Sequence, residues 1–300
     1  MTALAVWTQL QPSMAALDNR FMISIPAEVS HFLQTGQHDS DYGNWPGKNY
    51  FESARQADAI LRDALTAAVL ERRVKLKHEH CVHLTGLADL AAITRAKVVP
   101  MVTGLFPAVE RPQIMATLER SVVFLLPENI ESILRSHSGL SRSWTLANMY
   151  LLSFGAEPTS ETARGILGMS RETTCYLTID YLRDDHPDSL DDYLVHEAAH
   201  VFHNCRRTTV GLLETRTRQH LLNINFGKRE TFAYACEAYS KIIASGKSAA
   251  TRLEILESRR SWVPPDDTVD SAEYFDILQE AARARNGWMK ILRRCAQSRV

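Results

Sequence analysis

The twelve residues "YLVHEAAHVFHN", at positions 193–204, constrain the fold of this chain more than any other stretch. Three polar side chains, His196, Glu197 and His200, stand among apolar neighbours. Those neighbours are Leu194, Val195, Ala198, Ala199, Val201 and Phe202. Apolar density of this kind predicts a buried segment, and buried imidazoles and carboxylates need polar partners. The segment therefore has to face something that binds polar groups.

The flanking residues predict that this segment is a helix. Ser189 and Asp192 have the spacing of a capping box, which satisfies free backbone N–H groups at a helix start. Arg206 and Arg207 follow near the expected C-terminal end, where positive charge is favourable. We expect a helix from about residue 190 to 205.

On that helix, His196 and His200 lie four residues apart and share a face. Two imidazoles so placed can bind one zinc ion at about 2 Å. Glu197 lies about 100° further round the helix, so its carboxylate can take a proton from a zinc-activated water without binding the metal. The spacing supplies two metal ligands and a general base within five residues.

A third protein ligand has to come from elsewhere. His203 lies on the same face but about 10 Å along the helix axis from His196, so we expect it in a supporting rather than a ligating role. A second predicted helix, 227–246, carries Glu230, Tyr234 and Glu237 on one stripe. Glu230 is our first choice for the third ligand and Glu237 the second; the alternative is that this stripe is a solvated helix edge.

The HEAAH sequence, followed about 30 residues later by E-x-F-A at Glu230, resembles the gluzincin group of zinc metallopeptidases. The resemblance covers roughly residues 170–245. It implies that His196, His200 and Glu230 bind zinc and that Glu197 is the base. It also implies a substrate-binding edge strand at "TTCYLTIDYL", 173–182, whose polar face carries Tyr176, Thr178 and Asp180. Many members have an acidic residue where this chain has Tyr234, and such a tyrosine would instead donate a hydrogen bond to the oxyanion.

The rest of the chain predicts an α+β fold, a mainly helical zincin-like domain with a small mixed sheet. Helices are expected at 52–73, 128–137 and 143–154, and strands at 74–84, 121–126 and 173–182. Residues 39–51 read as a loop, and 98–112, with three prolines, as a connection. We divide the chain into an N-terminal α/β region of unknown role, 1–112, and a zincin-like catalytic domain, 113–300, and leave open whether the first is part of the same domain.

Composition limits the partners and the compartment. The net charge is −1, so nothing favours nucleic acid or an anionic membrane. Five scattered cysteines without a CxxC pair are typical of a reducing compartment. We find no signal peptide or membrane span and expect a cytoplasmic protein, with signal-independent export left open. His78, His80 and His83 favour a polar strand over a second metal site.

The sequence is consistent with two functions. The first is a zinc-dependent hydrolase, most plausibly a metallopeptidase acting on peptide or protein, with one Zn²⁺ per chain. The second is a zincin-shaped binding or regulatory protein with a structural or silent metal site. Glu197 favours the enzyme, because a structural site has no use for a base that activates water. The sequence leaves the oligomeric state and the substrate open.

Overall fold

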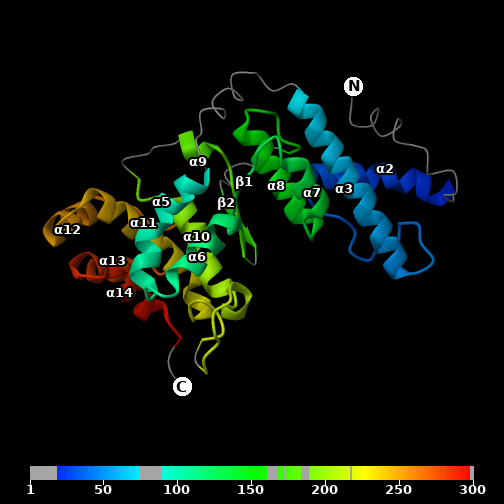
Figure 1. The fold of residues 1–300 in the computed structure, drawn as a ribbon. Helices are drawn as coiled ribbons and strands as arrows, with labels where there is room; N and C mark the ends of the chain where they lie inside the picture. The colour runs from blue at the N-terminus through cyan, green and yellow to red at the C-terminus, as the bar shows by residue number, and fades with distance from the viewer. Residues whose placement is uncertain are drawn as a thin grey trace. The chain divides into compact units, whose positions relative to one another are not determined.

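The computed structural model describes residues 19–74, 90–160, 168–171, 173–183, 189–216 and 218–297. These residues are mainly helical, and the strands among them form one three-stranded sheet of mixed direction. Figure 1 shows the elements in chain order. The α+β class predicted from the sequence is therefore confirmed.

The chain folds into two compact units. Unit 1 comprises Met1–Gly86, Leu125–Ile166 and Thr178–Asp180; unit 2 comprises Leu87–Phe124, Leu167–Leu177 and Tyr181–Val300. The sequence-based division at residue 112 does not coincide with them. The reason is that the helices Ile130–Ser136 and Leu140–Ser153 pack against the long helix Tyr50–Val74 of the N-terminal region.

Unit 1 is built from helices. They are α2 (Asn19–Thr35), α3 (Tyr50–Val74), α7 (Ile130–Ser136) and α8 (Leu140–Ser153). Leu61 and Leu65 of α3 are fully buried, as their helical spacing predicts. Gly36 ends α2 with a φ of +72°, and a Cβ there would lie 2.8 Å from the Trp144 ring, so only glycine fits.

Unit 2 holds the sheet and most of the helices. The strands are β1 (Val122–Phe124), β2 (Gly168–Arg171) and β3 (Thr174–Leu177). The helices are α5 (Leu90–Leu105), α6 (Arg111–Ser121), α10 (Tyr193–Asn204), α11 (Arg229–Ser245), α12 (Ala249–Ser258), α13 (Ser271–Arg283) and α14 (Gly287–Cys295), with short 3₁₀ turns η2 (Arg207–Val210) and η3 (Phe226–Lys228). A short helix, α9 (Asp180–Arg183), spans the boundary between the units.

The sheet has the order β1-β3-β2, with β3 parallel to β1 and antiparallel to β2. The segment predicted to be the edge strand is therefore the central strand, which is a correction. It is also shorter than the predicted 173–182. Leu177 pairs with Phe124 of β1 and Gly168 of β2, where both neighbours end their pairing, so no described strand remains to pair beyond it.

The predicted connection at 98–112 is also wrong, because α5 runs through Pro100 to Leu105. Val98, Met101, Val102 and Leu105 are buried at helical spacing, and this apolar face outweighs the hydrogen bond that the proline removes. The strand predicted at 74–84, with its three histidines, lies outside the described residues apart from Val74. In the described part of the chain, no helix is long and apolar enough to cross a membrane.

Candidate metal centre

Helix α10 positions the two histidines of the HEAAH sequence. Its N-cap is Asp192, whose side chain accepts a hydrogen bond from the Val195 backbone N–H at 3.3 Å. The predicted cap, Ser189, instead accepts from the Asp191 backbone N–H. The helix is buried on nearly all sides, so its polar residues point into protein, as the apolar pattern predicts.

Helix α11 packs against α10 and brings Glu230 to it from its first turn. The sequence places Phe232, Cys236, Tyr239 and Ile243 on one apolar stripe of this helix; the first three are buried, and Ile243 is half-buried. The acidic stripe lies on the other side, facing α10, and is not a solvated edge. Glu237 is only 1% exposed.

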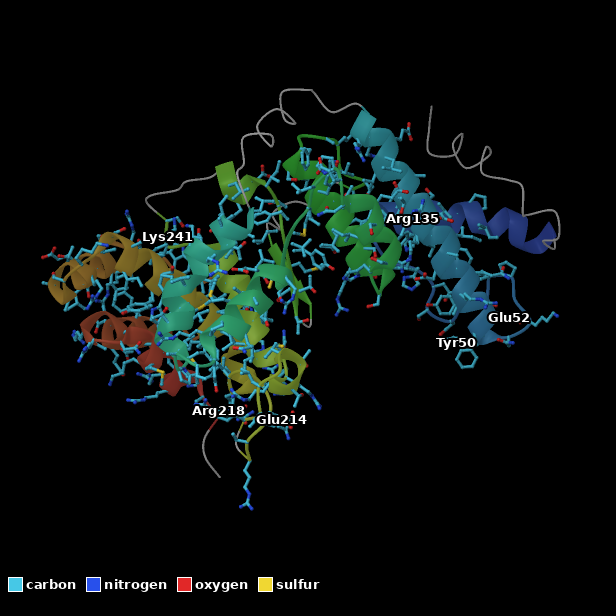
Figure 2. The ribbon with its side chains drawn as sticks, in the orientation of Figure 1. Tyr50, Glu52, Arg135, Glu214, Arg218 and Lys241 are labelled. Carbon is cyan, nitrogen blue, oxygen red and sulfur yellow. The ribbon has the colours of Figure 1, made fainter. Side chains whose placement is uncertain are left out.

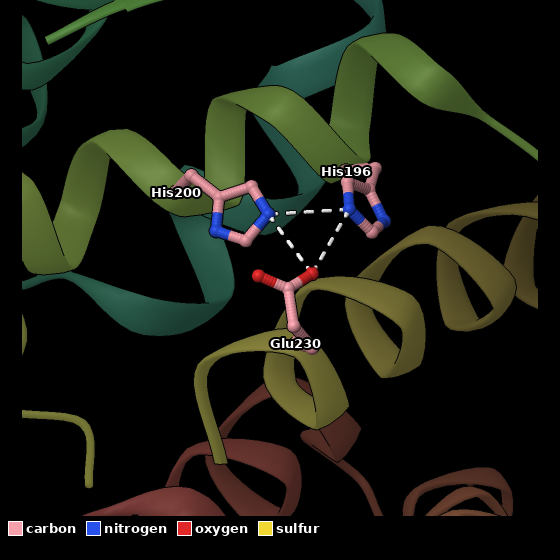
Figure 3. Close-up of side chains that lie close together, drawn as sticks. All are labelled: His196, His200 and Glu230. Atoms are coloured by element: carbon pink, nitrogen blue, oxygen red, sulfur yellow. Dashed lines mark hydrogen bonds and ion pairs between the residues drawn. The ribbon is translucent and has the colours of Figure 1, made fainter. Parts of the chain in front are cut away.

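The structure brings His196, His200 and Glu230 together as one group (Figure 3). The two Nε2 atoms lie 3.2 Å apart, and the Glu230 Oε2 lies 3.4 Å from His200 Nε2 and 3.7 Å from His196 Nε2. Ligands at about 2.0–2.2 Å from a tetrahedral zinc ion are separated by about 3.3–3.6 Å. The three atoms therefore have the spacing of three corners of a zinc tetrahedron, and the donor set of two imidazoles and one carboxylate suits that ion.

Glu237 orients His196 instead of joining this group. Its Oε2 accepts from His196 Nδ1 at 3.0 Å, and its Oε1 accepts from the Asp192 backbone N–H at 2.5 Å. A carboxylate on the outer nitrogen fixes the histidine tautomer and leaves Nε2 free for a metal. Glu237, the second choice for the third ligand, therefore contacts His196 from outside the group, and the first choice, Glu230, lies within the group.

His203 contacts the Nδ1 of His200, as Glu237 contacts the Nδ1 of His196, but His203 is a neutral partner. His200 Nδ1 lies 2.8 Å from His203 Nε2, and His203 Nδ1 lies 3.1 Å from the Asn204 Oδ1. If His200 Nε2 faces a metal, its Nδ1–H donates to His203, which donates onward to Asn204. This run of hydrogen bonds requires a neutral His203. Burial together with the charges of His200 and Arg229 lowers the pKa of His203 to about 3.

No protein-family model, curated protein or solved structure matches this chain. The site is therefore interpreted from its own geometry and from the residues that build it.

Glu197, the expected base, is buried beside the metal group. Its Oε2 has no hydrogen-bond partner among the described residues. Gly168 of β2 lies against it: a Cβ at Gly168 would come within 3.1 Å of the Glu197 Oε1 and Cγ. Cys175 of β3 donates to the Glu197 backbone oxygen at 3.0 Å. The Cys175 hydrogen bond thus holds α10 to the sheet at Glu197, while one carboxylate oxygen of Glu197 is buried without a hydrogen-bond partner among the described residues.

Tyr234 lies on the His196 side of the group. Its ring centroid is 4.4 Å from that of His196 and 6.4 Å from that of Trp262. Burial and the charges of Glu237 and Glu230 raise the pKa of Tyr234, so its hydroxyl keeps its proton. That state is the one needed by a hydrogen-bond donor.

The three residues assigned to a substrate strand are not brought into such a strand. Tyr176 lies on the central strand β3, Thr178 is buried beyond its end, and Asp180 begins α9. The sheet edge that packs against α10 is β2, residues 168–171. Its sequence, "GMSR", is too short to carry an alternating pattern, so sequence reasoning missed it.

A buried network behind His196 was also missed. Asp192 accepts from the Tyr181 hydroxyl at 2.7 Å and pairs with Lys97 at 3.0 Å, while its backbone N–H holds Glu237. These residues come from four separate segments, so no spacing in the sequence could have linked them. Through Asp192, this network links Glu237, the hydrogen-bond partner of His196 Nδ1, to α5 and α9.

In the metal-free site, His196 and Glu230 stabilise each other's charged form. Burial lowers the pKa of His196, but the carboxylate of Glu230 and the hydrogen bond with Glu237 raise it by more, to about 10. Burial raises the pKa of Glu230, but His196 and His200 lower it by more, well below its usual range. An ionised Glu230 thus lies beside two imidazoles, and a divalent cation bound by these three side chains would take the place of the His196 proton.

Proposed function

We propose that this protein is a zinc-dependent hydrolase acting on peptide bonds, with His196, His200 and Glu230 as the zinc ligands and Glu197 as the general base. The observation that carries the proposal is the triangle of three ligand atoms at the spacing of a zinc tetrahedron. The resemblance of HEAAH and E-x-F-A to the gluzincin pattern supports peptide bonds as the bonds that are hydrolysed.

Each residue has a separate task in this proposal. Zinc held here would supply Lewis acidity, polarising a substrate carbonyl and lowering the pKa of water. Glu197 takes the proton of the attacking water with its unpartnered Oε2 and passes it to the leaving amine. Tyr234, protonated beside His196, donates a hydrogen bond to the oxygen that gains negative charge.

The number of candidate ligands supports this proposal over a structural zinc site. Structural sites usually have four protein ligands, whereas catalytic sites have three and keep one position open. Among the described residues the group has three ligands. A zincin-shaped binding protein with a silent site is the alternative, and it assigns no task to Glu197.

Metal analysis and one matched pair of variants test the proposal. We expect about one zinc ion per chain in wild-type protein and cleavage of an unstructured protein or a peptide library. Glu197→Gln should keep the zinc and lose about 100- to 10,000-fold in rate, because only proton transfer is removed. Glu214→Gln, a change of the same kind at the exposed Glu214 (Figure 2), should leave both unchanged.

Three outcomes distinguish the proposed hydrolase from its alternatives. Folded protein that takes up no zinc contradicts the metal site. Bound zinc without cleavage of any peptide favours the silent site. Cleavage that persists unchanged in Glu197→Gln moves the base to another residue.

A further inference from the structure

Aromatic rings continue from the metal group into a neighbouring loop. The ring centroid of Tyr234 lies 4.4 Å from that of His196, and the ring centroid of Trp262 lies 6.4 Å from that of Tyr234. Trp262 belongs to the loop between α12 and α13. Rings attract each other at centroid separations of about 4.5–7 Å, preferably edge to face, which is the arrangement of both pairs. A single ring, that of Tyr234, thus stands between Trp262 and a proposed zinc ligand.

The two aromatic side chains reach solvent next to the metal group. The side chain of Glu230 is 37% exposed, so the group itself is open on the α11 side. Tyr234 follows Glu230 by four residues on α11 and therefore lies on the same face, where it is half-buried. Trp262 is also half-buried, and its neighbour Val263 is 55% exposed. Apolar surface therefore meets solvent beside the exposed edge of the metal group.

The loop and α13 support the ring of Trp262. That ring lies 5.7 Å, between centroids, from the ring of Tyr274 on α13, which is 2% exposed. The Trp262 backbone N–H donates to the Arg259 backbone oxygen at 2.9 Å. A ring that is already supported in this way loses little conformational freedom when a ligand packs on it. The entropy cost of using Trp262 as a contact is therefore small.

The position of these rings indicates which part of a substrate they would contact. Ligand sites usually combine apolar walls with a few polar groups that fix the orientation of the ligand. A peptide carbonyl held at the metal group would bring two side chains closest to the rings, those of the two residues that the cleaved bond joins. A further ring packed edge to face gains more than its buried area alone provides.

We propose that Tyr234 and Trp262 bind an aromatic side chain of the substrate on the His196 side of the metal group. This inference rests on the proposed hydrolase and names its substrate class: peptides that carry an aromatic residue directly beside the bond to be cleaved. Trp262 is the residue that determines this specificity, because Tyr234 already has a task at the oxyanion.

Binding of small hydroxamates to the zinc-loaded protein tests the proposal without relying on turnover. The probes are benzohydroxamate, phenylacetohydroxamate and 3-phenylpropionohydroxamate, each paired with the cyclohexyl compound of the same length, and acetohydroxamate, which carries no ring. The hydroxamate anchors on zinc, and the three lengths sample the distance to Trp262. Calorimetry should show one phenyl compound binding about 10- to 100-fold more tightly than acetohydroxamate. It should also bind about 2- to 10-fold more tightly than its cyclohexyl partner.

Variants of Trp262 assign this preference. Trp262→Ala should remove the advantage of the phenyl compound and leave the affinity of acetohydroxamate unchanged, while Trp262→Phe should keep part of the advantage. Trp262→Leu keeps apolar volume without the aromatic ring, so it should lose the preference for phenyl over cyclohexyl even if the alanine variant does not fold. Phe275→Ala is the matched control, because Phe275 is a half-buried ring on α13 that faces Arg260 at 4.7 Å. It should keep the wild-type preference.

The outcomes separate this inference from the proposed function. If all the hydroxamates bind equally and the Trp262 variants change nothing, Trp262 has no such role and the metal site stands. If the cyclohexyl compounds bind as tightly as the phenyl compounds, the surface selects apolar size, which contradicts the aromatic substrate class. If no hydroxamate binds to zinc-treated protein, the metal site itself fails and the inference falls with it.

A second arm identifies the side of the cleaved bond on which the aromatic residue lies. Peptides cleaved by the wild-type protein are bound to the Glu197→Gln variant, so that they stay intact. Weaker binding after a Phe→Ala change on the amino side of the bond assigns Trp262 to that residue, and weaker binding after the same change on the carboxyl side assigns it to the other. Affinity that is unchanged by both changes contradicts the proposal.

Discussion

At the scale of single residues, the two histidines of the metal group are held by partners of different charge. With Nε2 of each histidine on a metal, His196 Nδ1–H donates to the carboxylate of Glu237, whereas His200 Nδ1–H donates to the neutral ring of His203. A carboxylate partner makes an imidazole a stronger electron donor than a neutral partner does. His196 should therefore be the more tightly bound ligand.

The assignment of Glu230 rather than Glu237 as the ligand predicts unequal effects of matched substitutions. Glu230→Gln should weaken zinc binding by at least about 100-fold, because an anionic ligand is lost. Glu237→Gln keeps a hydrogen-bonding group of the same shape and should cost about tenfold. Competition with a chromophoric chelator measures both affinities. The reverse order would make Glu237 the ligand.

Proton release should accompany metal binding. The pKa of His196, about 10 in the metal-free protein, means that this residue is protonated at pH 7.5 and must lose a proton to bind zinc. Glu230 is already ionised, so it releases none. We expect about one proton released per zinc and an affinity that rises about tenfold per pH unit below pH 10.

Calorimetry in buffers of different ionisation enthalpy measures that proton. Glu237→Gln should reduce the release, because one of the interactions that raise the pKa of His196 loses its charge. A binding enthalpy independent of the buffer would contradict this reading.

At the scale of elements, the start of α10 fixes the position of the whole site. Asp192 caps the helix and also accepts hydrogen bonds from Tyr181 and Lys97. These contacts hold α10 to α9 and α5, and the Asp192 backbone N–H holds it to α11 through Glu237. Glu237 in turn holds the ring of His196 through its Nδ1.

Asp192→Ala should therefore destabilise the protein more than the loss of an ordinary cap. We expect a fall of about 2–3 kcal/mol in the free energy of unfolding, about 1 from the cap and the rest from the part-buried Tyr181 hydroxyl, which is left without an acceptor. Asp270, the exposed cap of α13, is the matched control, and Asp270→Ala should cost about 1 kcal/mol. Urea unfolding measures both, and equal losses would contradict the role of the network.

At the scale of the whole molecule, all three proposed ligands lie in unit 2. Zinc bound there stabilises the unit that contains the ligands by mass action, by about 2.7 kcal/mol at 100 times the dissociation constant. Hydrogen exchange read by mass spectrometry should therefore slow in α10 and α11 when zinc is added. The helices α3 and α8 of unit 1 should exchange at the same rate with and without zinc. Equal protection of both units would contradict a site confined to unit 2.

The sequence alone determined the features that depend on one helix. His196, Glu197 and His200 take their relative positions from the 3.6-residue repeat, which holds wherever the helix lies. The same repeat placed Glu230 and Glu237 on one face of the second helix. The α+β class also followed from local patterns, although Pro100 was given too much weight against the apolar face of α5.

Only the tertiary structure decided which residues of different elements meet. Glu230 and Glu237 lie on one stripe, and the way α11 packs on α10 makes one a candidate ligand and the other a partner of His196. β3 is the central strand because β2 pairs with the edge of β3 that β1 leaves open. β2 is too short to be recognised from its sequence pattern. Periodicity describes the faces of one element, whereas these contacts are set by side-chain packing between elements, which carries no repeat in the sequence.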